Sequence, residues 1–169
     1  MAVPNTDSVI IQCLFDRIAD NNKDDGPVSE LLAFLNSTNG DTRPIDKYRN
    51  AATIAVESDN AVVLALFTPK FTRTLTRVSL FASMIDSAIQ HKSYKCFVFL
   101  LQHPAVDVMC NEGLLFYLAI DSRCPYMLAR LCAHPSAKLD TAFLRELMVY
   151  ANSAAALFLE AFIPPPALE

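Results

Sequence analysis

Cysteine and histidine are the side chains in this sequence whose types and spacing could support catalysis or metal binding. Two cysteines lie near a histidine, Cys96 near His91 and Cys110 near His103, and a base beside a thiol is the pairing that nucleophilic catalysis requires. Cys96 belongs to an apolar helical pattern, and Cys110 is the one cysteine that we expect to be exposed. The sequence therefore predicts core or incidental thiols, with a small cysteine-dependent enzyme as an alternative.

Metal binding is the second chemistry that these side chains could support. His103, Cys110 and His134 would have to converge from successive loops, and with few acidic neighbours they make an incomplete ligand set for zinc. The chain has no Gly-rich phosphate loop, no His-Glu-x-x-His and no Gly-x-Ser-x-Gly. We therefore predict no catalytic residue, no metal site and no cofactor.

Length and composition predict a single domain in a reducing compartment. The chain has 169 residues, of which 53% are hydrophobic, yet apolar runs such as residues 154–159 are far shorter than a membrane span of about 20 residues. Five cysteines without a Cys-x-x-Cys pair predict free thiols and a cytoplasmic location. Residues 1–7 do not resemble a signal peptide, and Leu168-Glu169 resembles a cloning remnant, so the expected domain spans 1–167.

Charge is distributed unevenly along the chain. Residues 1–30 contain six acids and two basic residues, whereas residues 70–95 contain five basic residues and one acid. The five are Lys70, Arg73, Arg77, Lys92 and Lys95. This cluster predicts an acidic partner or an anionic surface, and an ordinary solvated face is the alternative. The net charge of −4 and the pI near 5.3 argue against general nucleic-acid binding.

The elements that must position these residues recur at a nearly constant spacing. Ala55, Ala88 and Ala119 anchor three similar segments at intervals of 33 and 31 residues, Ala151 follows at 32, and Ala19 precedes at 36. Such intervals are typical of stacked helix-turn-helix units, each of which buries its apolar stripe only against its neighbours. No strand-like alternation persists, so the sequence predicts an all-α fold.

We predict about five helix pairs joined by short finger loops, with a compact helical bundle or another α-solenoid as the alternative. The expected units cover residues 7–40, 43–72, 75–108, 112–139 and 141–163. Thr68-Pro69 is expected to end a helix, as are two His-Pro dipeptides that lie 31 residues apart. The last helix is expected to bury a stripe made of Leu157, Phe158, Ala161 and Phe162.

The stretch from Ser87 to Asp107 resembles an ankyrin repeat, from the alanine of Ser87-Ala-Ile-Gln-His through the paired leucines of Phe99-Leu-Leu-Gln-His-Pro to the Asp of the finger. The next loop, Asp107-Val-Met-Cys-Asn-Glu-Gly, is similar to the Asp-Val-Asn finger of that family. The chain departs from the family in its first helices, where other residues replace the family's Thr-Pro-Leu-His. The hydrogen bonds that Thr and His make between repeats in that family are therefore expected to be mostly missing. The family has a glycine in the turn between the two helices of a repeat, and this chain has Asp59, Lys92 and Arg123 at these positions. Each of these turns is therefore expected either to keep a left-handed backbone or to adopt a different turn conformation.

The resemblance to a divergent ankyrin-repeat protein implies a non-enzymatic protein–protein interaction module. Its partner would contact the finger loops and the exposed face of the first helices, and the strong divergence favours a viral or bacterial protein acting in a host cytosol. A self-associating helical protein, such as a homodimer, is the alternative, because the apolar content could leave one end of the stack uncovered. The expected partner-binding residues are Lys70, Phe71, Arg73, Arg77, Lys92, Met109, Asn111, Glu112 and Tyr117.

Overall fold

Helices make up the regular structure of the chain. The computed structural model describes residues 6–20, 26–36, 44–71, 77–104 and 106–163, and within these ranges it has ten helices and no strand. The helices are α1 (Thr6–Asp20), α2 (Gly26–Asn36), α3 (Pro44–Glu57), α4 (Ala61–Phe71), α5 (Arg77–Gln90), α6 (Tyr94–Leu101), α7 (Cys110–Asp121), α8 (Pro125–Cys132), α9 (Thr141–Tyr150) and α10 (Ser153–Glu160). The all-α prediction is confirmed. None of these helices is both long enough and apolar enough to cross a membrane.

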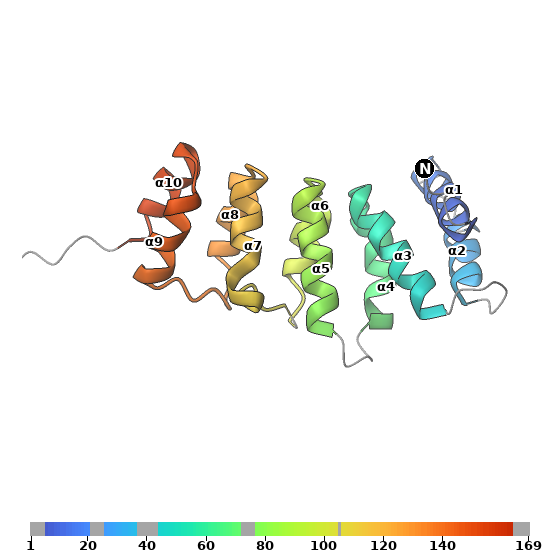
Figure 1. Ribbon diagram of the computed structural model, residues 1–169. Coiled ribbons are helices and arrows are strands. Elements are labelled where there is room, and N and C mark those ends of the chain that lie inside the picture. Colours follow the sequence, from blue (N-terminus) through green and yellow to red (C-terminus); the bar gives the residue numbers. More distant parts are fainter. Residues whose placement is uncertain (1–5, 21–25, 37–43, 72–76, 105, 164–169) are drawn as a thin grey trace, which may run out of the picture.

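The helices are arranged as antiparallel pairs that stand side by side in sequence order (Figure 1). Helix α5, for example, packs on its partner α6 and on the first helices of the two neighbouring pairs, α3 and α7. The turns within the later pairs lie along one long edge of the row, and the loops that lead into α7 and α9 lie along the opposite edge (Figure 1). Each inner pair is therefore covered on two sides, which accounts for the high apolar content of a chain this short.

The core lies between the first and second helices of the pairs. Ala55, Ala88 and Ala119, the alanines on which the segments align, are at most 1% exposed, and their small side chains let neighbouring helices approach closely. The second helices contribute larger apolar side chains, as the sequence predicts for α6 and α8. Those that are buried include Cys96, Phe97, Leu100, Met127, Leu128, Leu131 and Cys132.

The last pair differs from the predicted pattern. Leu157 is 70% exposed, Phe162 is 41% exposed and Ala161 is also exposed, so the predicted burial is wrong for these three residues. Phe158 is half-buried and packs against the core, to which the buried Ala155 and Leu159 belong. Among the described residues this pair packs on a neighbouring pair on one side only, so part of its apolar surface stays exposed (Figure 1). Ala151 follows the end of α9 with an extended backbone, and it is not equivalent to the three earlier alanines.

The turns of three pairs share one backbone path. Asp59, Lys92 and Arg123 adopt left-handed conformations, with φ of 52°, 56° and 53°, so the residues that replace glycine keep the turn and bear its strain. In each turn the next residue donates its N–H to the carbonyl of the buried alanine, which closes the helix as a Schellman motif. These bonds join Asn60 to Ala55, Ser93 to Ala88 and Cys124 to Ala119, at 2.8, 2.8 and 2.9 Å.

Asp59 also connects two pairs through its side chain. Its Oδ1 accepts hydrogen bonds from the N–H groups of Lys95 at 2.8 Å and Cys96 at 3.0 Å, in the first turn of α6. Ser93, the residue at the N-cap position of α6, makes no capping bond with its own side chain. The carboxylate of the preceding pair therefore caps α6, and its negative charge lies at the favourable end of the helix dipole.

A second connection between pairs involves His134. Its Nε2 lies 3.1 Å from the carbonyl oxygen of Leu101, and its Nδ1 lies 2.8 Å from Oγ of Ser136, which accepts from the N–H of Val108 at 3.0 Å. These contacts tie the loop after α8 to the end of α6 and to the loop that precedes α7. They supply hydrogen bonds between neighbouring pairs at residues other than those the ankyrin pattern uses.

Two helix boundaries differ from those expected. Helix α4 continues through Pro69 to Phe71, so the predicted end at Thr68-Pro69 is wrong, and α5 begins at Arg77. The two His-Pro dipeptides do mark helix ends, because α6 ends at Leu101 and α8 ends at Cys132.

Candidate partner-binding surface

The thiols that could act as nucleophiles are poorly placed for it. Cys96 is buried and donates to the carbonyl of Ala55, and burial together with the Asp59 carboxylate raises its pKa to about 12. Burial and the nearby Asp107 also raise the pKa of Cys110, which is half-buried. The prediction that Cys110 is the exposed cysteine is wrong, since the exposed one is Cys13.

The histidines considered as bases or ligands are occupied by other contacts. His91 is exposed and lies 3.9 Å from a carboxylate oxygen of Glu57, while the ring of His103 stacks on Phe81 with centroids 4.2 Å apart. His134 forms the link between pairs described above. In the part of the chain that the structure describes, no group of three or more His, Cys, Asp or Glu side chains could hold a metal ion.

The predicted partner-binding residues lie in more than one place. Lys92 is exposed in the turn between α5 and α6, on the opposite long edge of the row from the loop that leads into α7 (Figure 1). Lys70 and Phe71 belong to the last turn of α4 and Arg77 is the first residue of α5, but their side chains and the whole of Arg73 lie outside the described part of the structure.

The remaining predicted residues do come together on α7. Met109, Asn111, Glu112 and Tyr117 all line one groove between α7 and α9, with a volume of about 690 Å³. Met109 is half-buried and packs against the core, whereas Asn111 and Glu112 are exposed. This groove is the part of the structure in which sequence-predicted residues are closest to forming a site.

Three grooves follow one another along the first helices, and neighbouring grooves share lining residues. The groove between α3 and α5 shares Ser83 and Asp86 with the groove between α5 and α7, which in turn shares Asn111 and Leu114 with the groove between α7 and α9. We call the exposed side chains of α3, α5, α7 and α9 that line these grooves the first-helix surface. It forms one continuous strip across four helix pairs.

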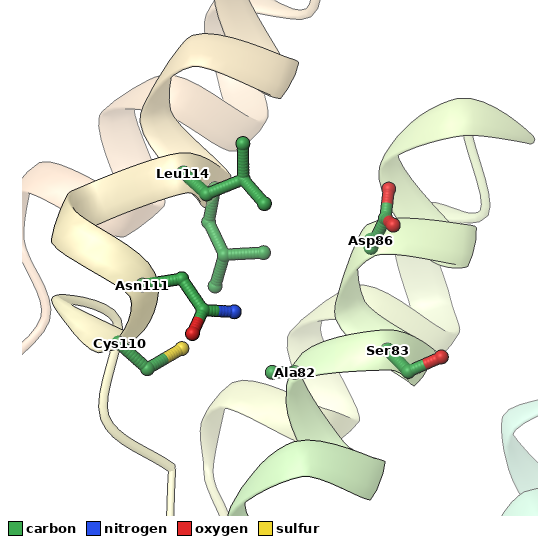
Figure 2. Close-up of a pocket in the computed structure, with 7 residues that line it drawn as sticks. Ala82, Ser83, Asp86, Cys110, Asn111 and Leu114 are labelled. Carbon is green, nitrogen blue, oxygen red and sulfur yellow. The ribbon is translucent and has the colours of Figure 1, made fainter.

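The middle groove has a volume of about 400 Å³ and a largely apolar lining. Figure 2 shows Cys110, Asn111 and Leu114 of α7 directed toward α5, where Ala82 lies opposite them. The hydroxyl of Ser83 points away from α7 in the same view. Leu114 is 44% exposed and lines the grooves on both sides of α7, so it is a central apolar contact of the strip.

The groove between α7 and α9 contains an aromatic cluster. The ring of Tyr117 meets Phe143 and Tyr150 edge to face, with centroids 6.3 and 5.4 Å apart. The Tyr117 hydroxyl donates to Oε1 of Glu146 at 2.8 Å. Desolvation, this hydrogen bond and the negative charges of Glu146 and Glu112 raise the pKa of Tyr117 to about 12. The groove therefore combines aromatic rings with a negative potential.

An unusual backbone segment sets the position of the groove's α7 side. Asn111, Glu112 and Gly113 have φ of 52°, 57° and 76°, so three successive residues are left-handed before the regular helix begins. A β-carbon at position 113 would lie 2.5 Å from Cζ of Phe143, so a larger residue would displace that ring, and the φ of 76° independently favours glycine. The segment holds the exposed Asn111 and Glu112 beside α9.

Sequence reasoning missed the α9 side of this groove. Phe143, Glu146 and Tyr150, together with Lys138 and Asp140 of the preceding loop, line it but were not predicted. One signal was present, because Tyr150 follows Tyr117 by 33 residues, the same interval that separates Ala55 from Ala88.

Comparison of the chain with models of protein families, with curated proteins and with solved structures finds no match in any of the three. Inferences about the first-helix surface therefore rest on its own shape, apolar content and charge.

Proposed function

We propose that this protein is a non-enzymatic module of stacked, ankyrin-like helix pairs that recognises a protein partner through the first-helix surface. The observation that supports this most directly is the continuity of the three grooves, which share lining residues from α3 to α9. Within the strip, the exposed Tyr150 is of a residue type that is enriched at interfaces, and the exposed Leu114 adds apolar contact area.

The ankyrin-like part of the proposal is supported by the geometry of the pairs. Buried alanines at similar intervals, three identical turns and hydrogen bonds from one pair to the next are what a stack of related units would show. A rigid surface of this kind binds with little ordering cost, because its helices are positioned by their neighbours before the partner arrives.

The proposal of a binding role also rests on the chemistry of the thiols. A catalytic cysteine needs an accessible thiolate with a lowered pKa, whereas burial raises the pKa of Cys96, Cys110 and Cys132. All five cysteines are free, in keeping with the reducing compartment that we propose.

Two adjacent residues of α9 allow a sharp test. Tyr150 is 64% exposed and lines the α7–α9 groove, while Val149 is 81% exposed and lines none of the three grooves. Affinity purification with the wild type and with Val149→Asp is expected to retain the same discrete partner, quantified by mass spectrometry, and Tyr150→Asp is expected to lose it. Retention by Tyr150→Asp, or the absence of any partner, would contradict the proposal.

Self-association is a second candidate function, favoured by the apolar surface of the last pair. Val149 and Leu157 are 81% and 70% exposed, and this pair lies at the end of the row (Figure 1). A second copy that covered this end would bury side chains that water contacts in the single chain.

A further inference from the structure

The charges around the α7–α9 groove indicate what kind of partner segment it would accept. Glu112, Asp140 and Glu146 contribute three carboxylates to its lining, against the single ammonium group of Lys138. The Asp140 carboxylate is already engaged, because it caps α9 by accepting from the N–H of Phe143 at 2.8 Å. The groove as a whole therefore carries net negative charge.

Two of these carboxylates retain unused acceptor capacity. Glu146 accepts one hydrogen bond at Oε1, from Tyr117, and both Glu112 and Glu146 are exposed. Within the described residues neither of them forms a salt bridge, and Lys138 does not neutralise them by direct contact. A carboxylate can accept several donors, so this pair can receive a cationic group.

The aromatic rings add a second attraction for the same kind of group. Tyr117 and Tyr150 are nearly perpendicular, with an interplanar angle of 84°. The face of an aromatic ring attracts an ammonium or guanidinium ion, and a guanidinium can also stack on a ring while it bonds to a carboxylate. Rings and carboxylates in one groove thus favour a basic side chain over an acidic or a neutral one.

We infer that the α7–α9 groove receives a basic side chain, arginine or lysine, from a protein partner, with its charged end held by Glu112 and Glu146 beside the rings of Tyr117 and Tyr150. This inference rests on the proposed function, because it specifies the chemistry of the segment that the first-helix surface recognises. Acidic segments and nucleic acid are repelled by the same carboxylates.

The test uses peptides of known sequence. A random peptide library displayed on phage is selected on the immobilised protein, and the strongest binder is synthesised with a fluorescent label for anisotropy titrations. The selected sequences are expected to contain a conserved arginine or lysine next to apolar residues. Replacing that basic residue with neutral citrulline or norleucine is expected to weaken binding about tenfold.

Charge reversal provides the matched comparison on the protein side. The double variant Glu112→Lys/Glu146→Lys is expected to bind the peptide at least about tenfold more weakly than the wild type. Its affinity is also expected to vary much less with salt concentration. Asp121→Lys/Glu160→Lys makes the same change in net charge at two exposed residues outside the three grooves, and its affinity is expected to stay within about twofold. Circular dichroism verifies that both variants are folded.

The outcomes separate this inference from the proposed function. If the selected peptides bind the wild type and are lost with Tyr150→Asp, but contain no basic residue or bind equally well after charge reversal, the inference is wrong and the proposed function stands. If no selected peptide binds the wild type, or binding is unaffected by Tyr150→Asp, the failure belongs to the proposed function itself.

Discussion

At the scale of single residues, polar and reactive side chains serve the stack. The thiol of Cys96 donates a hydrogen bond to the carbonyl of Ala55. The side chains of Asp59 and His134 form hydrogen-bond contacts between one helix pair and the next. In the sequence Cys96 is a candidate nucleophile and His134 a candidate metal ligand because of their residue types, and the structure shows the packing and hydrogen bonds that occupy them. Burial is a property of the assembled pairs, which explains why the exposed thiol was misassigned to Cys110 when it is Cys13.

The buried thiol of Cys96 predicts a loss of stability at alkaline pH. Its pKa is about 12 in the folded protein and near the ordinary value of 9.0 when unfolded, so the unfolded chain releases this proton first. The stabilisation is therefore complete below pH 9.0 and is lost as the pH rises toward 12.

Urea denaturation between about pH 8 and pH 10.5 measures this effect. The free energy of unfolding of the wild type is expected to fall with a steeper slope than that of Cys96→Ala, which has no thiol to ionise at this position. Equal slopes would show that Cys96 does not contribute. Cys13→Ala, which removes one exposed thiol, is measured beside Cys96→Ala as the comparison variant.

At the scale of elements, neighbouring helices complete one another. Helix α6 makes no capping bond with its own Ser93, and the carboxylate of Asp59 satisfies two of its first N–H groups across the boundary between pairs. The left-handed turn that contains Asp59 is what aims the side chain at α6. Asp59 therefore both forms the turn after α3 and caps α6, and a substitution at this position affects both.

Replacing Asp59 separates the two roles. Asp59→Ala removes the acceptor and keeps a β-carbon in a left-handed turn, so it is expected to lower the free energy of unfolding by about 1–3 kcal/mol. Asp59→Asn keeps an acceptor and tolerates the turn, and it should cost less than half as much. Chemical denaturation followed by circular dichroism gives both values. A loss no larger than that of the exposed Asp121→Ala would contradict the assigned cap.

The elements also show how far sequence reasoning extends. The sequence predicted the buried alanines at 55, 88 and 119, and it located the turns at Asp59, Lys92 and Arg123 but left open whether they are left-handed. The α7–α9 groove was only half predicted. Its α9 side depends on the left-handed run from Asn111 to Gly113 and on how closely α9 can approach Gly113, and neither follows from a residue pattern.

At the scale of the whole molecule, the two ends and the long faces of the row differ in what they offer to other molecules. The first-helix surface combines grooves, rings and charges, whereas the last pair, α9 and α10, also exposes apolar side chains that line none of the three grooves. Val149 and Leu157 are the clearest examples at that end. Recognition of a partner and association between copies would therefore use different residues and can be tested separately.

If copies associate through this end, their mass in solution depends on concentration and on Leu157. Sedimentation velocity over a hundredfold range of concentration is expected to show dimers for the wild type and monomers for Leu157→Glu, because a buried charge disfavours the contact. Val62→Glu, on α4 and also highly exposed at 74%, serves as the control and should behave as the wild type. Monomers of the wild type throughout would exclude self-association over that range.

The cap that Asp59 places on α6 also bears on the order in which the protein is made. Asp59 precedes the first amide it binds by 36 residues, and Leu101 precedes His134 by 33, so each link joins a pair to the one synthesised just before it. A nascent chain that emerges from the ribosome thus meets its acceptors already in place, and no contact of this kind waits for a distant segment. During translation, each folded pair can therefore provide the surface on which the next pair packs.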